Sequence, residues 1–156
     1  MFAKHRFEAI MIGNAAAALH GAPVTTLDID FMFRKTPANL NKLKAVAKSF
    51  DASILKPYYP VSDLFRVVND EKGLQLDFMT KLHGIRSFEG LRSRSESVQF
   101  GEHELKIACL EDIIKRKRAT GRDRDFAVLE ILEKTLNEQK SAKDKEGPGS
   151  GSQKRE

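Results

Sequence analysis

Cysteine and long hydrophobic runs are almost absent from this sequence of 156 residues. Cys109 is the single cysteine, so an intramolecular disulfide is excluded and we expect a reducing, cytoplasmic environment. No apolar run approaches the roughly 20 residues that are needed to cross a bilayer, so no membrane partner is expected. The N-terminal segment MFAKHRF also lacks the hydrophobic stretch of a secretory signal.

Residues that commonly bind zinc are scarce as well. The four histidines are scattered without the spacing of zinc ligands, so we expect no zinc site. Cys109 lies in the apolar stretch IACL, which favours a small core residue over a nucleophile. The sequence contains no internal repeat.

The residues that are present describe a globular protein. Hydrophobic residues make up 40% of the chain and charged residues 31%, which is the balance of a soluble domain. The length is sufficient for one core without disulfides or a structural metal. From residue 140 onward Ala142 is the only apolar residue, and a Gly-Pro-Gly-Ser-Gly-Ser run follows it. We therefore predict one domain over residues 1–139 and a flexible polar tail over residues 140–156.

The net charge is +5, and much of the basic charge falls between residues 115 and 125. A basic cluster attracts phosphate groups, whether on a nucleotide or on a nucleic acid. The alternative is a solvated helix face. The cluster consists of Lys115, Arg116, Lys117, Arg118, Arg122 and Arg124, opposed by Asp123 and Asp125.

Hydrophobic periodicity predicts an α+β fold, in which short strands and helices follow one another. The predicted strands are residues 8–12, 27–34, 64–69 and 74–79, with a further hairpin over 97–108. The loop Asp70–Gly73 would join the strands 64–69 and 74–79 into a hairpin. The predicted helices are residues 14–20, 37–50, 110–119 and 123–139, the last with Phe126, Leu129 and Leu132 on or near its buried stripe.

Asp28 and Asp30 lie two residues apart in the alternating stretch LDIDFMFR. The alternation predicts a half-buried strand whose core face carries Leu27, Ile29, Phe31 and Phe33. Both carboxylates would then project from the other face, with Cα atoms roughly 6–7 Å apart. Two carboxylates this close repel one another unless they share a cation or a proton. A hard divalent cation such as Mg²⁺ is the usual partner where phosphate is handled.

An Asp-x-Asp pair is most often a pair of exposed acids, but this one lies within an apolar strand, where an unpaired charge is costly. Asp77 has the same placement on the strand 74–79, opposite to Leu76 and Phe78. If the two strands are neighbours, three acids converge on one patch. Two metal ions at such a patch would activate an attacking hydroxyl group and stabilise a departing pyrophosphate.

Gly13 and Asn14 stand where the first strand gives way to a short alanine-rich helix. A glycine at this point lets the backbone approach a ligand closely, and free amides at a helix N-terminus favour phosphate oxygens. Asn14 could instead cap the helix, and both roles can coexist.

These residues resemble the signature of the polymerase-beta-like nucleotidyltransferase superfamily. The similar segments are Gly13-Asn14-Ala15, His20-Gly21 and Thr26-Leu27-Asp28-Ile29-Asp30. In that signature a Gly-Ser or Gly-Gly pair precedes Asp-x-Asp, and a third acid lies on a later strand. The chain is most similar to small bacterial proteins grouped with the abortive-infection type nucleotidyltransferases, some of which are toxins of toxin–antitoxin pairs. The resemblance covers roughly residues 8–136 and implies a nucleotidyltransferase fold: a small mixed, mainly antiparallel sheet flanked by helices, with helices at the C-terminus.

The resemblance also implies an activity: Mg²⁺-dependent transfer of a nucleoside monophosphate from an NTP to a hydroxyl group of RNA or tRNA, of a protein or of a small molecule. Gly13 and Asn14 would contact the triphosphate. Asp28 and Asp30 would bind two metal ions, and Asp77 would complete one metal site and help to deprotonate the acceptor. An antitoxin protein is the partner that the toxin assignment implies.

The basic segment between residues 115 and 125 also resembles the superfamily pattern. Lys117 matches a lysine that neutralises the triphosphate in related enzymes, and Arg122 is the companion of Asp125 in an Arg-x-x-Asp turn. Asp125 is either catalytic or a cap of the last helix. Thr26, at the start of the Thr-Leu-Asp-Ile-Asp motif, is a further candidate for the site.

Two departures from the family pattern leave other functions open. Position 14 is Asn where the superfamily prefers Ser or Gly, and the chain begins almost at its first strand where many relatives have a helix. The second departure is compatible with a trimmed architecture, a homo-oligomer that fills the gap, or an incomplete gene product. The alternatives are a catalytically inactive module that binds RNA or a protein partner, and a metal-dependent nuclease that uses the same acids.

Overall fold

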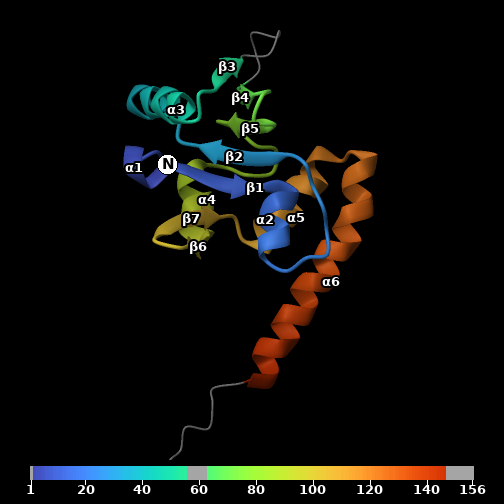
Figure 1. Ribbon diagram of the computed structural model, residues 1–156. Helices are drawn as coiled ribbons and strands as arrows, with labels where there is room; N and C mark the ends of the chain where they lie inside the picture. Colours follow the sequence, from blue (N-terminus) through green and yellow to red (C-terminus); the bar gives the residue numbers. More distant parts are fainter. Residues whose placement is uncertain (1, 56–62, 147–156) are drawn as a thin grey trace, which may run out of the picture.

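The computed structural model describes residues 2–55 and 63–146. The chain forms a seven-stranded sheet in the order β3-β4-β5-β2-β1-β7-β6 (Figure 1). The strands are β1 (Ala9–Ile12), β2 (Ile29–Phe33), β3 (Ser53–Leu55), β4 (Leu64–Asn69), β5 (Leu74–Met79), β6 (Glu96–Phe100) and β7 (His103–Ile107). The pairs β2·β5 and β1·β7 are parallel, and the other four pairs are antiparallel. The predicted α+β fold with a mixed, mainly antiparallel sheet is confirmed.

Six helices accompany the sheet in the described part of the chain. They are α1 (Phe2–His5), α2 (Gly13–Leu19), α3 (Pro37–Ser49), α4 (Phe88–Arg94), α5 (Leu110–Thr120) and α6 (Asp123–Glu146). Local signals explain several of their ends. The Thr36 hydroxyl caps α3 by accepting a hydrogen bond from the amide of Asn39, and α5 ends at Gly121, which adopts a left-handed conformation. Helix α5 packs against both α2 and α6.

An aromatic cluster fills the core on one face of the sheet. Register pairs Phe31 of β2 with Phe78 of β5, and their rings stack with centroids 5.0 Å apart. Phe33 and Phe7 surround this pair, and Phe2 of α1 closes the cluster. Because side chains of a strand alternate between faces, the polar partners of these aromatics project to the opposite side of the sheet.

The prediction for residues 27–34 was wrong in two respects. Leu27 was expected in the core, but it is 99% exposed, and β2 begins only at Ile29. The Thr26 hydroxyl bonds both the backbone N–H and the C=O of Asp28, so a local turn takes up these groups before the strand starts. Met32, expected on the outer face, is buried, because β2 lies in the middle of the sheet and is covered on both sides.

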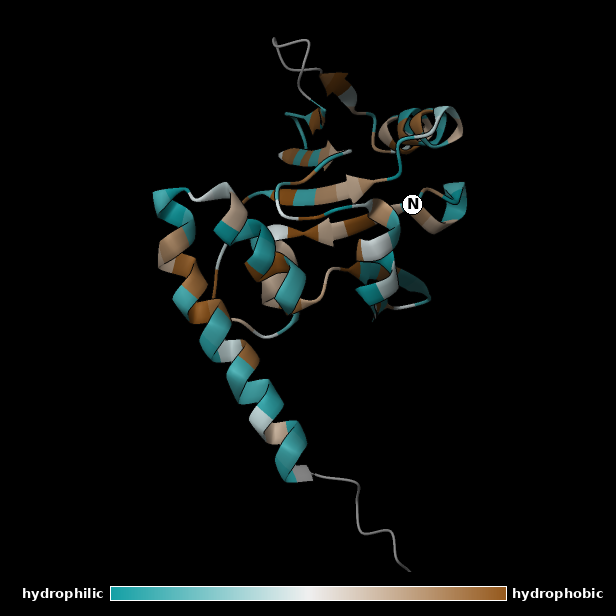
Figure 2. Cartoon of the chain, turned by 180° about the vertical axis from the view of Figure 1, so that it is seen from behind, coloured by the Kyte–Doolittle hydropathy of each residue, from teal (hydrophilic) through white to brown (hydrophobic). Residues whose placement is uncertain are grey.

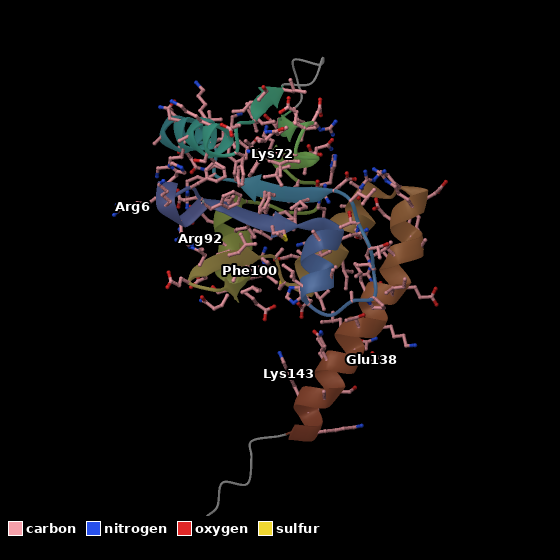
Figure 3. All side chains as sticks on the ribbon, in the orientation of Figure 1. Arg6, Lys72, Arg92, Phe100, Glu138 and Lys143 are labelled. Atoms are coloured by element: carbon pink, nitrogen blue, oxygen red, sulfur yellow. The ribbon has the colours of Figure 1, made fainter. Side chains whose placement is uncertain are left out.

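Helix α6 also differs from its prediction. It continues to Glu146, seven residues past the expected end at Gln139, through exposed residues with good helix propensity such as Lys140 and Ala142. This part of the helix extends away from the sheet and is mostly hydrophilic, with Lys143 in open space (Figures 2 and 3). Of the predicted tail, residues 147–156 lie outside the described residues, and the division at residue 139 stays a prediction.

Phe126, expected on or near the buried stripe of α6, is 55% exposed. The buried stripe instead runs through Asp125, Leu129 and Leu132, one helical step away from Phe126. The carboxylate of Asp125 can lie in this buried stripe because Lys117 and Arg122 are paired with it. Within residues 2–55 and 63–146, no helix has both the length and the apolar character to cross a membrane.

Candidate active site

Strand register brings two of the predicted acids together. Asp30 of β2 is the direct cross-strand partner of Asp77 of β5, and Asp77 is in turn the partner of Arg66 on β4. Residues that are paired in register share one face of a sheet, so these three side chains form a row. On the other side of Asp30, Ile12 of β1 is its partner, and Gly13 follows at the start of α2. The row therefore ends at the junction of β1 and α2.

The row opens into a cavity of about 520 Å³ between the sheet, α5 and the start of α6. Every site residue that was predicted from the sequence lines this one cavity; these are Gly13, Asn14, Thr26, Asp28, Asp30, Asp77, Lys117, Arg122 and Asp125. The structure thus brings the whole set together, while the role of each member stays a prediction. The cavity is lined in addition by Leu64, Arg66, Met79, Arg116, Arg124 and Val128.

Gly13 leaves space for Asp30. Its φ of +72° is in the left-handed region, and a Cβ at this position would lie 3.3 Å from Oδ2 of Asp30. Both facts favour glycine: the backbone conformation is strained for other residues, and a side chain would press on the carboxylate. The floor of the cavity therefore stays open at the point where Asp30 reaches it.

Asn14 carries a buried acceptor atom without a partner. Its Oδ1 makes no hydrogen bond within the described part of the chain, although Asn14 lines the cavity. The capping role that was considered for Asn14 is wrong, because α2 begins at Gly13, with Ile12 at the cap position and no side-chain cap. A buried unpaired oxygen is costly, so a donor group supplied by a ligand would lower the energy of this site.

The two paired carboxylates have different electrostatic surroundings. Burial raises the pKa of Asp30 above its ordinary value; the nearby charge of Arg116 opposes this rise, and Asp77 and Asp28 add to it. Asp77 instead accepts two hydrogen bonds from Arg66, at 2.8 Å to Oδ1 and 3.2 Å to Oδ2. Asp30 is therefore short of positive charge, whereas Asp77 already has a cation.

The donor chemistry of the cavity fits Mg²⁺, but the three carboxylates do not form a finished cage. Hard divalent cations prefer oxygen ligands, and Asp28, Asp30 and the unpaired Oδ1 of Asn14 supply them. In the described ranges no group of three His, Cys, Asp or Glu side chains stands ready to hold a metal ion. Both oxygens of Asp77 accept hydrogen bonds from Arg66. Asp28 and Asp30 are thus the residues that would hold a metal first.

The basic end of the cavity is built around Asp125, which is 2% exposed. Its carboxylate accepts hydrogen bonds from Arg122 at 2.7 and 3.3 Å, and Nζ of Lys117 lies 3.6 Å from Oδ1. Burial alone would raise the pKa of Asp125, but the hydrogen bonds and charge of Arg122 and the charge of Lys117 outweigh it and hold that pKa below its ordinary value. Asp125 is therefore an ionised centre that joins α5 to α6.

Sequence reasoning missed three cations that the cavity contains, Arg66, Arg116 and Arg124. Arg116 and Arg124 were counted only in the basic cluster and not placed at the site. Arg66 could have been found, because the predicted hairpin with its loop at Asp70–Gly73 already sets position 66 opposite position 77.

Comparison with known proteins gives an independent account of the same architecture. The family described as "Nucleotidyl transferase of unknown function (DUF2204)" matches residues 2–147. No curated protein matches the chain by sequence.

Three solved structures are similar in fold. The antibiotic-resistance factor ANT(2'')-Ia matches with a TM-score of 0.62 and 10% identity, over 90% of this chain and 81% of its own. A structure described as a nucleotidyltransferase, TM1012 from Thermotoga maritima, matches with a TM-score of 0.52 and 20% identity, over 84% and 83%. JHP933 from Helicobacter pylori matches with a TM-score of 0.50 and 21% identity, over 90% and 69%. At these identities the likeness shows the fold, and the predicted nucleotidyltransferase fold is confirmed.

Proposed function

Because the chain belongs to this nucleotidyl transferase family, we propose that it is a Mg²⁺-dependent enzyme that transfers a nucleoside monophosphate from an NTP to a hydroxyl group of an acceptor. The observation that supports this proposal is that carboxylates (Asp28, Asp30 and Asp77) and cations (among them Arg116 and Arg122) line one cavity. Magnesium bound there would neutralise phosphate charge and lower the pKa of the attacking hydroxyl group.

The carboxylates and the basic residues of the cavity have separate tasks in this reaction. Asp28 and Asp30, together with Oδ1 of Asn14, would hold the cation, which would neutralise charge on the phosphates. The basic residues from α5 and the start of α6 face the β- and γ-phosphates. The acceptor oxygen forms a bond to the α-phosphorus, the bond from that phosphorus to the β-phosphate bridge oxygen breaks, and pyrophosphate leaves.

Asp77 would take the proton of the acceptor hydroxyl group, but only after its hydrogen bonds with Arg66 are broken. Arg66 donates hydrogen bonds to both oxygens of Asp77. An incoming nucleotide offers Arg66 phosphate oxygens as alternative acceptors, which fit the guanidinium equally well. Nucleotide binding would in this way free the third carboxylate.

For the acceptor we propose RNA, with tRNA as the first substrate to test, and for the biological role a toxin that a protein antitoxin neutralises in the bacterial cytoplasm. Arg124 lines the cavity and is exposed, so it is accessible to a polyanionic acceptor. A homo-oligomer remains a prediction whose test is the mass of the purified chain in solution.

The test is incubation of the full chain with total tRNA and each of the four NTPs, labelled at the α-phosphate, in Mg²⁺ or Mn²⁺. Labelled RNA and released pyrophosphate are expected with at least one NTP. The matched control is the double variant Asp28→Asn with Asp30→Asn, which keeps side-chain volume but removes the charges. Absence of label with all four NTPs, on tRNA, protein and small-molecule acceptors alike, would refute the proposal. Cleavage of RNA without NTP would support a nuclease instead.

The Arg66–Asp77 pair favours one alternative, a catalytically inactive module that binds RNA or a protein partner. If Arg66 never releases Asp77, the third carboxylate has no part in chemistry. Calorimetry separates the two functions: an inactive module would bind RNA but show no heat with any NTP and Mg²⁺.

A further inference from the structure

Two cations of the cavity, Arg116 and Arg124, have no anionic partner among the described residues. Arg66 is paired with Asp77, and both Lys117 and Arg122 are paired with Asp125. For Arg116, no carboxylate oxygen of the described residues lies within 4.0 Å. Arg124, which is also unpaired in the described ranges, is exposed and therefore hydrated. Among the described cations of the cavity, Arg116 thus differs in being partly buried and without a carboxylate partner.

The hydrogen bonds of Arg116 are also incomplete. Its Nε is buried and has no partner in the described structure. One terminal nitrogen approaches the sulfur of Met79 at 3.9 Å, which is a weak acceptor. A buried N–H group without a partner is costly in a free protein, and a charged one more so. An anion that accepts hydrogen bonds from Arg116 would therefore stabilise this site.

The surroundings indicate where this anion would lie. Burial lowers the pKa of Arg116; the nearby charges of Asp30 and Asp125 oppose this shift, and that of Arg122 adds to it. Arg116 therefore lies near the carboxylates of both Asp30 and Asp125, and all three residues line the same cavity. The phosphates of a nucleotide bound in this cavity would therefore come near Arg116.

We infer that Arg116 is the residue that binds the triphosphate of the nucleotide, the contact that the family resemblance implies for Lys117. This inference rests on the proposed function. Lys117, which is 5% exposed and neutralised by Asp125, instead joins α5 to α6. The planar guanidinium donates through Nε and a terminal nitrogen in parallel, a geometry that suits two oxygens of one phosphate group.

Binding of inorganic tripolyphosphate and of each NTP to the full chain tests the inference, by calorimetry with and without Mg²⁺. Arg116→Gln should weaken binding about 10- to 100-fold, the loss of charge-assisted hydrogen bonds from one side chain. Its melting temperature should stay equal or rise, since an unpaired buried charge is removed. Arg116→Lys keeps the positive charge but loses the two parallel N–H donors of the guanidinium, so it should recover only part of the affinity for tripolyphosphate.

Lys117→Met is the matched comparison on the same helix. It leaves Asp125 with Arg122 alone, so it should lower the melting temperature and change tripolyphosphate affinity much less than Arg116→Gln does. Equal affinity of Arg116→Gln and the unchanged chain, or no binding of tripolyphosphate by the unchanged chain, would overturn the inference. Tripolyphosphate binding that depends on Arg116, without transfer from any NTP, would refute the proposed function and leave the inference standing.

Discussion

Arg66 and Asp77 face each other across β4 and β5 as register partners, and the guanidinium donates to both oxygens of the carboxylate. The same carboxylate is the register partner of Asp30 on its other side. A metal ion at Asp30 and the guanidinium at Arg66 therefore compete for one group. The state of this pair determines whether the cavity presents two carboxylates or three.

Replacement of Arg66 by Met should expose this competition. Asp77, which is 9% exposed in the unchanged chain, would lose its cation beside Asp30, so the metal-free variant should lose about 1 kcal/mol of stability. The value is small because the Arg66 side chain is 42% exposed. Divalent cations should bind the variant more tightly and restore its melting temperature. Thermal unfolding in EDTA and in a Mn²⁺ series measures both effects.

The control is Arg92→Met, which removes an exposed arginine paired with Glu8 away from the cavity. It should leave the Mn²⁺ dependence of the melting temperature unchanged. If Arg66→Met and the unchanged chain respond to Mn²⁺ alike, Asp77 does not contribute to cation binding.

Asp30→Asn should stabilise the chain in EDTA at neutral pH. The pKa of Asp30 in the folded state is raised, mainly by burial, with Asp77 and Asp28 adding to it. A raised carboxyl pKa means that stability is present below the ordinary value near 3.8 and is lost as the pH rises through the folded pKa. Asp30→Asn cannot ionise at this position, so its free energy of unfolding should not fall for this reason as the pH rises. Urea unfolding from pH 3.5 to 7 should show the two free-energy curves diverging as the pH rises, and parallel curves would contradict the expectation.

Gly13→Ala should impair both stability and cation binding. The left-handed backbone at φ +72° should cost about 1–2 kcal/mol, and the new Cβ would lie 3.3 Å from Oδ2 of Asp30. Gly101→Ala is the control for the cost of the left-handed backbone. Gly101 has φ +62°, and a Cβ added there would meet no described atom within 4 Å. Both variants should melt earlier, and only Gly13→Ala should bind Mn²⁺ more weakly. Equal Mn²⁺ affinity in the two variants would remove Gly13 from the site.

Cys109 should react slowly with thiol reagents. Burial, with the nearby carboxylate of Asp112 adding to it, raises the pKa of the thiol to about 11. At pH 8 the thiolate is then about one part in a thousand, against about a quarter for an unfolded thiol of pKa about 8.5. Alkylation by iodoacetamide, followed by mass spectrometry, should be about 100-fold slower in the folded chain than in urea. A similar rate in both states would mark Cys109 as a reactive group.

The hairpin of β4 and β5 was predictable in full, because a four-residue loop between two alternating strands sets the register. The turn at Asp28 was not predictable, since the hydrogen bonds of the Thr26 hydroxyl to the backbone of Asp28 are not revealed by strand periodicity. Helices α1 and α4 and strand β3 are too short for a periodic signal. The unpaired state of Arg116 depends on side chains from β5 and α6, so only the folded chain shows it.

The central claim is that side chains 28 and 30 hold a divalent cation beside a nucleotide, and that residue 77 then leaves Arg66. Anomalous diffraction from crystals grown with Mn²⁺ and a non-hydrolysable NTP tests it most directly. We predict a manganese peak within coordination distance of Asp28 and Asp30, with the Asp77 carboxylate turned from Arg66 toward the metal. A cavity without a peak, or a bound nucleotide with both Arg66 hydrogen bonds intact, would contradict the account.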